Sequence, residues 1–86
     1  MIIKTSKDYD KSFTKKDKFI QKKALERIKL FIQDPNNILL KNHALAGKYK
    51  GERSFNVTGD YRIIFYYVYK NTACFTDIGT HPELYE

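Results

Sequence analysis

Two histidines, an arginine and an aspartate are the residues of this chain best suited to acid–base chemistry. His43 and His81 are its only histidines, and both lie in segments without an apolar stripe, where loops are expected. Histidine can give and take a proton near neutral pH because its ordinary pKa is about 6.5. Each could equally be a plain surface histidine. Neither is followed by further ligands at metal-binding spacing, so we expect no metal site.

Arg62 stands out because it lies in a run of residues that should form a buried strand. An unpaired buried guanidinium is costly, so it needs a carboxylate partner or an anionic ligand. Asp60, two residues away on the same strand face, is one candidate partner. A phosphate is the other, because its oxygens match the fork of the guanidinium. The sequence leaves both interpretations open.

These residue types are sufficient for cleaving RNA, which carries its own nucleophile in the ribose 2′-OH. One group removes the 2′-OH proton, a fixed cation stabilises the charge on the phosphorane, and an acid protonates the departing 5′-oxygen. Histidine, aspartate and arginine are groups of the required kinds. The residue types permit this reaction but do not select it.

The elements that must position these residues are one strand, two helices and three further strands. The clearest is the second helix, where Ile20, Ala24, Ile28 and Phe31 recur at helical spacing. The last strand but one is apolar on both faces, which predicts a central position in the sheet. We expect an α+β fold with the order β-α-α-β-β-β, in which a twisted, mainly antiparallel sheet packs against a helix hairpin. The expected ranges are 2–4, 7–16, 18–33, 52–58, 61–69 and 72–79, joined by an irregular connection over 38–51, all within one domain (1–86).

The positive charge is concentrated in the first half of the chain. Residues 1–50 hold thirteen Lys/Arg against five Asp/Glu, whereas residues 51–86 hold three against five. Such a field attracts polyanions such as RNA or an acidic protein, although a solvated helix face would have the same composition. The single cysteine, Cys74, excludes an internal disulfide and is expected to pack within a strand. With no apolar run near the ~18 residues of a membrane span and no signal peptide, we expect a cytoplasmic protein that contacts no membrane.

Four segments resemble motifs of the RelE/ParE toxin superfamily, and of its YafQ-like branch in particular. Leu40 to Gly47 is similar to a "hydrophobic-x-x-His-x-Leu-x-Gly" segment, and the run Lys50 to Ser54 is similar to a "Gly-x-Arg-Ser/Glu" strand entry. The Asp60-Tyr61-Arg62 run resembles the "Asp-Tyr-Arg-hydrophobic" start of the central strand in proteins of this superfamily. The run Ile78 to Tyr85 resembles a closing "Gly-Thr-His-x-x-Leu/Val-Tyr/Phe" motif. Each motif is weak alone, but their order and spacing together are fairly specific.

The resemblance implies the toxin of a bacterial type II toxin–antitoxin system that cleaves mRNA on the ribosome, without a metal or another cofactor. Its partners would be a cognate antitoxin protein, mRNA and the ribosome. Carried over position by position, it implies proton transfer by His81 and Asp60, with phosphate stabilisation by Arg62. The remaining implied site residues are His43 for activity, Tyr85 for stacking on the substrate, and Arg53 as a second phosphate contact. Because residues two apart on a strand point to the same face, Arg53 could instead lie beneath the sheet with Phe55. We also expect Lys48 and Lys50 to bind ribosomal RNA by charge.

The chain departs from the YafQ pattern at two positions. Asn56 stands where a histidine is frequent, and Asp77 stands where some members carry an arginine. Asn56 cannot move a proton at neutral pH, and Asp77 would repel phosphate if it faced the site. Two alternatives therefore stay open: a ParE-like binding module that inhibits gyrase without cutting RNA, and a catalytically weak toxin that mainly binds its antitoxin. The paired histidines favour the enzyme.

Overall fold

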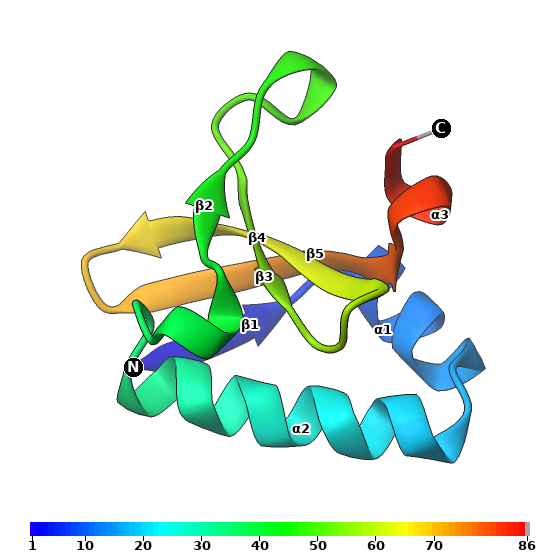
Figure 1. The fold of residues 1–86 in the computed structure, drawn as a ribbon. Helices are drawn as coiled ribbons and strands as arrows, with labels where there is room; N and C mark the ends of the chain where they lie inside the picture. The colour runs from blue at the N-terminus through cyan, green and yellow to red at the C-terminus, as the bar shows by residue number, and fades with distance from the viewer. Residues whose placement is uncertain (86) are drawn as a thin grey trace.

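A computed structural model describes residues 1–85 as a sheet with helices on one face and a short last helix at the end of one strand (Figure 1). Five strands form the sheet in the order β1-β5-β4-β3-β2; β1 is parallel to β5, and all other neighbours are antiparallel. The strands are β1 (Ile2–Thr5), β2 (His43–Ala44), β3 (Arg53–Asn56), β4 (Tyr61–Tyr69) and β5 (Thr72–Thr80). The helices are α1 (Lys7–Lys15), α2 (Lys18–Gln33) and α3 (His81–Tyr85), with single 3₁₀ turns at Ile38–Leu40 and Gly47–Tyr49.

The α+β class and the predicted order of the long elements are confirmed, and β4 is the central strand as expected. Two short elements were not predicted. β2 has two residues and α3 has five, too few for either to show a periodic pattern. β2 exists because β3 supplies its sheet partners, and α3 forms directly after the last strand. Both unpredicted elements carry proposed site residues.

Side-chain caps begin the two long helices. The Ser6 hydroxyl accepts a hydrogen bond from the backbone N–H of Tyr9 at 3.0 Å, and a carboxylate oxygen of Asp17 accepts one from the N–H of Ile20 at 2.9 Å. These bonds satisfy N–H groups that the first turn of a helix leaves without a partner. Within the described residues, no helix has the length and apolar character that crossing a membrane requires.

The core lies between α2 and one face of the sheet, and Phe31 is at its centre. This side chain is fully buried, and its ring centroid lies 4.7 Å from that of Phe55, 4.9 Å from that of Phe65 and 5.9 Å from that of Phe75. The three partners come from β3, β4 and β5. One helix residue therefore connects α2 to the three central strands.

The strand register determines which side chains share the face that α2 leaves uncovered. His43 is paired with Ser54 and Ser54 with Ile64, while Asn56 is paired with Arg62. Directly paired residues point to the same side of a sheet, and alternate residues of one strand do too. His43 and Arg62 consequently lie on one face, opposite the aromatic core.

We predict that Phe31→Ala lowers the free energy of unfolding by about 3–5 kcal/mol, because it removes a large side chain from a fully packed site. Urea denaturation measures the loss. The matched control is Phe19→Ala on the same helix, where the side chain is 67% exposed; it should change stability by less than about 0.5 kcal/mol. Equal losses in the two variants would contradict this description of the core.

Candidate functional site

Two adjoining hollows lie where β4 begins and β5 ends, and Arg62 and His81 line both of them. The first, about 480 Å³, is otherwise lined by Gly59, Asp60, Tyr61, Thr80 and Pro82. The second, about 370 Å³, is otherwise lined by His43, Ala44, Leu45, Ala46 and Tyr85. Five of the residues predicted to form the site therefore lie together, although they are far apart in the sequence: two line both hollows, and each of the other three lines one. The five are His43, Asp60, Arg62, His81 and Tyr85.

Arg62 is half-buried near the start of β4, and its guanidinium makes a single long hydrogen bond within residues 1–85. Its Nη1 donates a hydrogen bond to the carbonyl oxygen of Gly59 at 3.5 Å, which is long. The ion pairs within residues 1–85 are Lys16–Glu83 and Lys23–Glu26, so Arg62 and Asp60 form none. The guanidinium remains able to bind an anion in either hollow.

Asp60 and His81 are connected through the backbone. Asp60 lies in the exposed turn before β4, and its carbonyl oxygen accepts a hydrogen bond from the N–H of His81 at 3.3 Å. This bond holds the beginning of α3 against the beginning of β4. It brings two ionisable side chains to one hollow with Arg62.

The α3 helix presents His81 and Tyr85 on one side. The two residues are four apart, one helical turn, and their ring centroids are 4.6 Å apart. The His81 side chain is exposed, whereas Tyr85 is half-buried. The imidazole can therefore reach both hollows, while the phenol ring forms a wall of the second.

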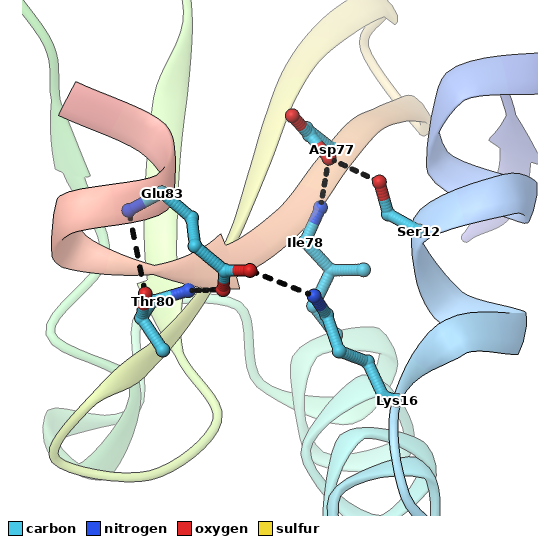
Figure 2. A network of polar contacts seen from close by, with 6 residues as sticks. All are labelled: Ser12, Lys16, Asp77, Ile78, Thr80 and Glu83. Atoms are coloured by element: carbon cyan, nitrogen blue, oxygen red, sulfur yellow. Dashed lines mark hydrogen bonds and ion pairs between the residues drawn. The ribbon is translucent and has the colours of Figure 1, made fainter. Parts of the chain in front are cut away.

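Reciprocal hydrogen bonds begin α3, and Figure 2 shows them. The Thr80 hydroxyl accepts from the N–H of Glu83 at 3.3 Å, and a carboxylate oxygen of Glu83 accepts from the N–H of Thr80 at 2.7 Å. This is a capping box, whose Thr-x-x-Glu spacing could have been recognised in the sequence. The ammonium of Lys16, just after α1, lies 3.6 Å from the other carboxylate oxygen of Glu83. Lys16, Thr80 and Glu83 thus orient His81, although we had not predicted them.

A glycine just before this box lets α3 lie close to the sheet. A Cβ atom on Gly79 would lie 3.2 Å from the carboxylate oxygen Oε1 of Glu83 and 3.4 Å from Cδ2 of Leu84. Leu84 is 2% exposed and anchors the helix. The glycine of the Gly-Thr-His motif therefore has a packing reason here.

His43 lies across the second hollow from α3. Its Nδ1 lies 2.8 Å from the carbonyl oxygen of Lys41. A carbonyl oxygen only accepts, so Nδ1 carries the hydrogen, and Nε2 of the neutral ring is left as the proton acceptor. The exposed β2 strand holds the ring beside the hollow while leaving this nitrogen free to react.

Arg53 lines neither hollow, so the structure does not bring this predicted phosphate contact together with the other predicted site residues. It is paired with Phe65 on the face toward α2, and its Nε donates to the side-chain oxygen of Asn42 at 2.9 Å. Arg53 and Phe55 are two residues apart on β3, so they point to the same face of the sheet. Lys48 and Lys50 are exposed in the connection between β2 and β3 and line neither hollow.

The two departures from the YafQ pattern have different surroundings. One carboxylate oxygen of Asp77 accepts hydrogen bonds from the Ser12 hydroxyl at 2.9 Å and from the N–H of Ile78 at 2.8 Å (Figure 2). This carboxylate is thus tied to α1 and lines neither hollow. Asn56 lies beside Arg62 on the uncovered face, and its buried side-chain oxygen has no hydrogen-bond partner among residues 1–85. Within the same residues, no group of three or more His, Cys, Asp or Glu side chains could hold a metal ion.

Comparison with known proteins gives a consistent result. The whole chain, residues 1–86, matches the model of a family described as bacterial toxin of type II toxin-antitoxin system, YafQ. YafQ from E. coli strain BL21(DE3) has a similar structure: TM-score 0.77, 25% identity, 98% of this chain and 97% of that chain covered. A chain of the E. coli DinJ-YafQ toxin-antitoxin complex is similar with a TM-score of 0.76 and 26% identity, and the match covers 98% of this chain and 96% of that chain.

Similarity extends beyond YafQ at the level of the fold. A chain of the RelBE2 toxin-antitoxin complex from Mycobacterium tuberculosis gives a TM-score of 0.76 at 13% identity, with 93% of this chain and 96% of that chain covered. No curated protein sequence matches the chain.

We predict that acid weakens the attachment of α3. The N–H of Thr80 and then its hydroxyl hold the pKa of Glu83 below the ordinary 4.5, with a further contribution from Lys16. A lowered folded-state pKa means that the ionised carboxylate stabilises the fold fully above the ordinary value, and that this stabilisation is lost as pH falls through the folded-state pKa. The protection factors of the α3 amides, which correct for the intrinsic pH dependence of exchange, should therefore fall more between pH 5 and pH 3 in wild type than in Glu83→Gln. Identical pH dependence in the two proteins would refute the role of this carboxylate.

Proposed function

The chain belongs to the YafQ family of bacterial type II toxins, and from this premise we propose that it is an endoribonuclease that cleaves mRNA on the ribosome without needing a metal. The observation that supports this proposal is the shared position of Arg62 and His81 between two hollows. A phosphodiester joins two nucleosides, so a cleavage site needs one central anion-binding group and space on both sides. The cytoplasm, where ribosomes are found, is the proposed place of action.

The reaction uses the nucleophile that RNA supplies. The 2′-oxygen attacks phosphorus as its proton passes to a base, and the bond from phosphorus to the 5′-oxygen breaks as an acid protonates that oxygen. The products are a 2′,3′-cyclic phosphate and a 5′-hydroxyl, so atoms and charge balance without a covalent enzyme intermediate. Arg62 stabilises the charge that accumulates on the phosphorane, because a fixed guanidinium needs no reorganisation as that charge develops.

Proton transfer is assigned to His81 and Asp60, which line the first hollow together with Arg62. His81 is well suited because an imidazole exchanges protons near neutral pH. His43 faces the second hollow with an accepting Nε2 and supports binding or catalysis there. The Tyr85 ring offers a stacking surface for a base in that hollow.

Positive charge outside the hollows suits the ribosome as the setting. Lys48 and Lys50 are exposed in the connection between β2 and β3, and lysines that contact phosphates add affinity without base selectivity. As a type II toxin the chain has a protein antitoxin as its partner. We propose that the antitoxin buries apolar surface and counters the same basic charge.

Single substitutions test the catalytic assignments. His81→Ala and Asp60→Asn should each lower the rate of mRNA cleavage in a translating extract by about 10²–10⁴-fold, and Arg62→Ala by about 10²–10³-fold. The control is Arg27→Lys, a conservative change on α2 away from the hollows, which should cut at the wild-type rate. Equal cutting by all variants would reject the assignments. Gyrase inhibition without RNA cleavage would instead favour the ParE-like alternative.

A modified substrate should separate the acid from the base. Replacing the bridging 5′-oxygen at the cleavage site with sulfur gives a leaving group that departs without protonation. The variant that lacks the acid should regain most of its rate on this RNA, because the step it has lost is no longer needed. The variant that lacks the base should stay slow. Rescue of neither His81→Ala nor Asp60→Asn would show that the acid is another residue.

A further inference from the structure

The connection between β2 and β3 reaches over the sheet to the last helix. We call residues 45–52 the arm; Figure 1 shows it extending above the sheet on the side where α3 lies. Within the arm, the phenol of Tyr49 donates a hydrogen bond to the carbonyl oxygen of Leu84 at 2.6 Å. The Tyr49 ring also meets the ring of Tyr85 edge-on, with centroids 5.6 Å apart and an interplanar angle of 86°. The arm and α3 are thus joined by one polar and one aromatic contact.

The helix that receives this contact has little stability of its own. α3 has only five residues, so its carbonyl groups have almost no intrahelical partners. The Tyr49 phenol satisfies one of them at the C-terminal end, opposite the capping box. It also completes a series of ring contacts, since Tyr85 touches both Tyr49 and His81.

Two glycines give the arm the shape that directs Tyr49 toward α3. Gly47 has φ +65° and Gly51 has φ +94°, and a Cβ at either position would meet nothing within 4 Å. Backbone conformation, rather than crowding, therefore requires glycine there. Between them, the N–H of Lys50 donates to the carbonyl of Gly47 at 3.1 Å, and the N–H of Glu52 to that of Tyr49 at 2.9 Å. The arm is a defined turn that carries Tyr49 and two lysines.

The phenol remains a donor over the pH range in which RNA is cleaved. Burial raises the pKa of Tyr49 above its ordinary 10.0, with smaller contributions from the charges of Asp77, Tyr85 and Glu52. The hydrogen bond to Leu84 therefore persists throughout the range in which a histidine changes protonation.

We propose that Tyr49 is a positioning residue that fastens the arm to α3 and thereby sets His81 and Tyr85 against His43 across the second hollow. His43 lies in β2, immediately before the arm, whereas His81 and Tyr85 belong to α3; Tyr49 spans these two walls of the hollow. The catalytic consequence rests on the proposed ribonuclease function. The structural consequence, a fixed α3, does not.

Tyr49→Phe removes the hydrogen bond and keeps the ring contact. We expect kcat for RNA cleavage to fall about tenfold, since small misplacements of a reacting group are costly, while KM changes less than twofold. The control is Tyr69→Phe at the other end of β4, where the side chain is 75% exposed; it should leave kcat unchanged. A rise in KM alone would overturn the proposal, because it would place Tyr49 in RNA binding.

Two measurements on the free protein make the test independent of activity. Tyr49→Phe should shift the His81 imidazole resonances and accelerate amide exchange in α3 at least fivefold, with the global unfolding midpoint near that of wild type. Unchanged His81 resonances and α3 exchange would overturn the proposal, as would acceleration spread evenly over the chain. Should wild type fail to cleave RNA, the ribonuclease function fails, and the exchange data still decide whether Tyr49 holds α3.

Discussion

The pairing of β4 with its two neighbours is the constraint on which the rest of the structure depends. Because side chains alternate along a strand, this register directs Phe65 toward Phe31 of α2 and Arg62 toward the opposite face. A shift of one residue would exchange the two sets and place a guanidinium in the aromatic core, which is prohibitive without a partner. The packing that stabilises the protein therefore also exposes the arginine of the site.

The site itself is assembled from elements that cannot stand alone. β2 has two residues and α3 has five, and each depends on contacts outside itself: sheet pairing with β3 for β2, and Leu84, the capping box and Tyr49 for α3. Short elements held by a few contacts tend to open locally with low free energy. Such a site can be precise when its supports are present, and it can respond when a partner displaces one of them.

The chain's departures from the YafQ pattern are easier to understand in this setting. The Asp77 carboxylate is engaged by Ser12 of α1, so it fastens a helix to β5 and lines neither hollow. Asn56 is paired with Arg62 but lines neither hollow, and its amide cannot transfer a proton. The ionisable groups that line the hollows, besides Arg62, are His43, Asp60, Tyr61, His81 and Tyr85, which limits the assignments that a mechanism can use.

The sequence alone determined the long elements, since α2 and β4 carry periodic apolar patterns that extend over many residues, and its motifs predicted Asp60, Arg62 and His81 as site residues. Tertiary structure decided what local pattern cannot: that Arg53 faces the core side, that Asp60 and Arg62 form no ion pair with each other, and that Tyr49 reaches a helix 35 residues further along the chain. The physical reason is range. Periodicity and caps act between residues a few positions apart, whereas the two hollows exist only where strand register and the docking of α3 bring distant segments together.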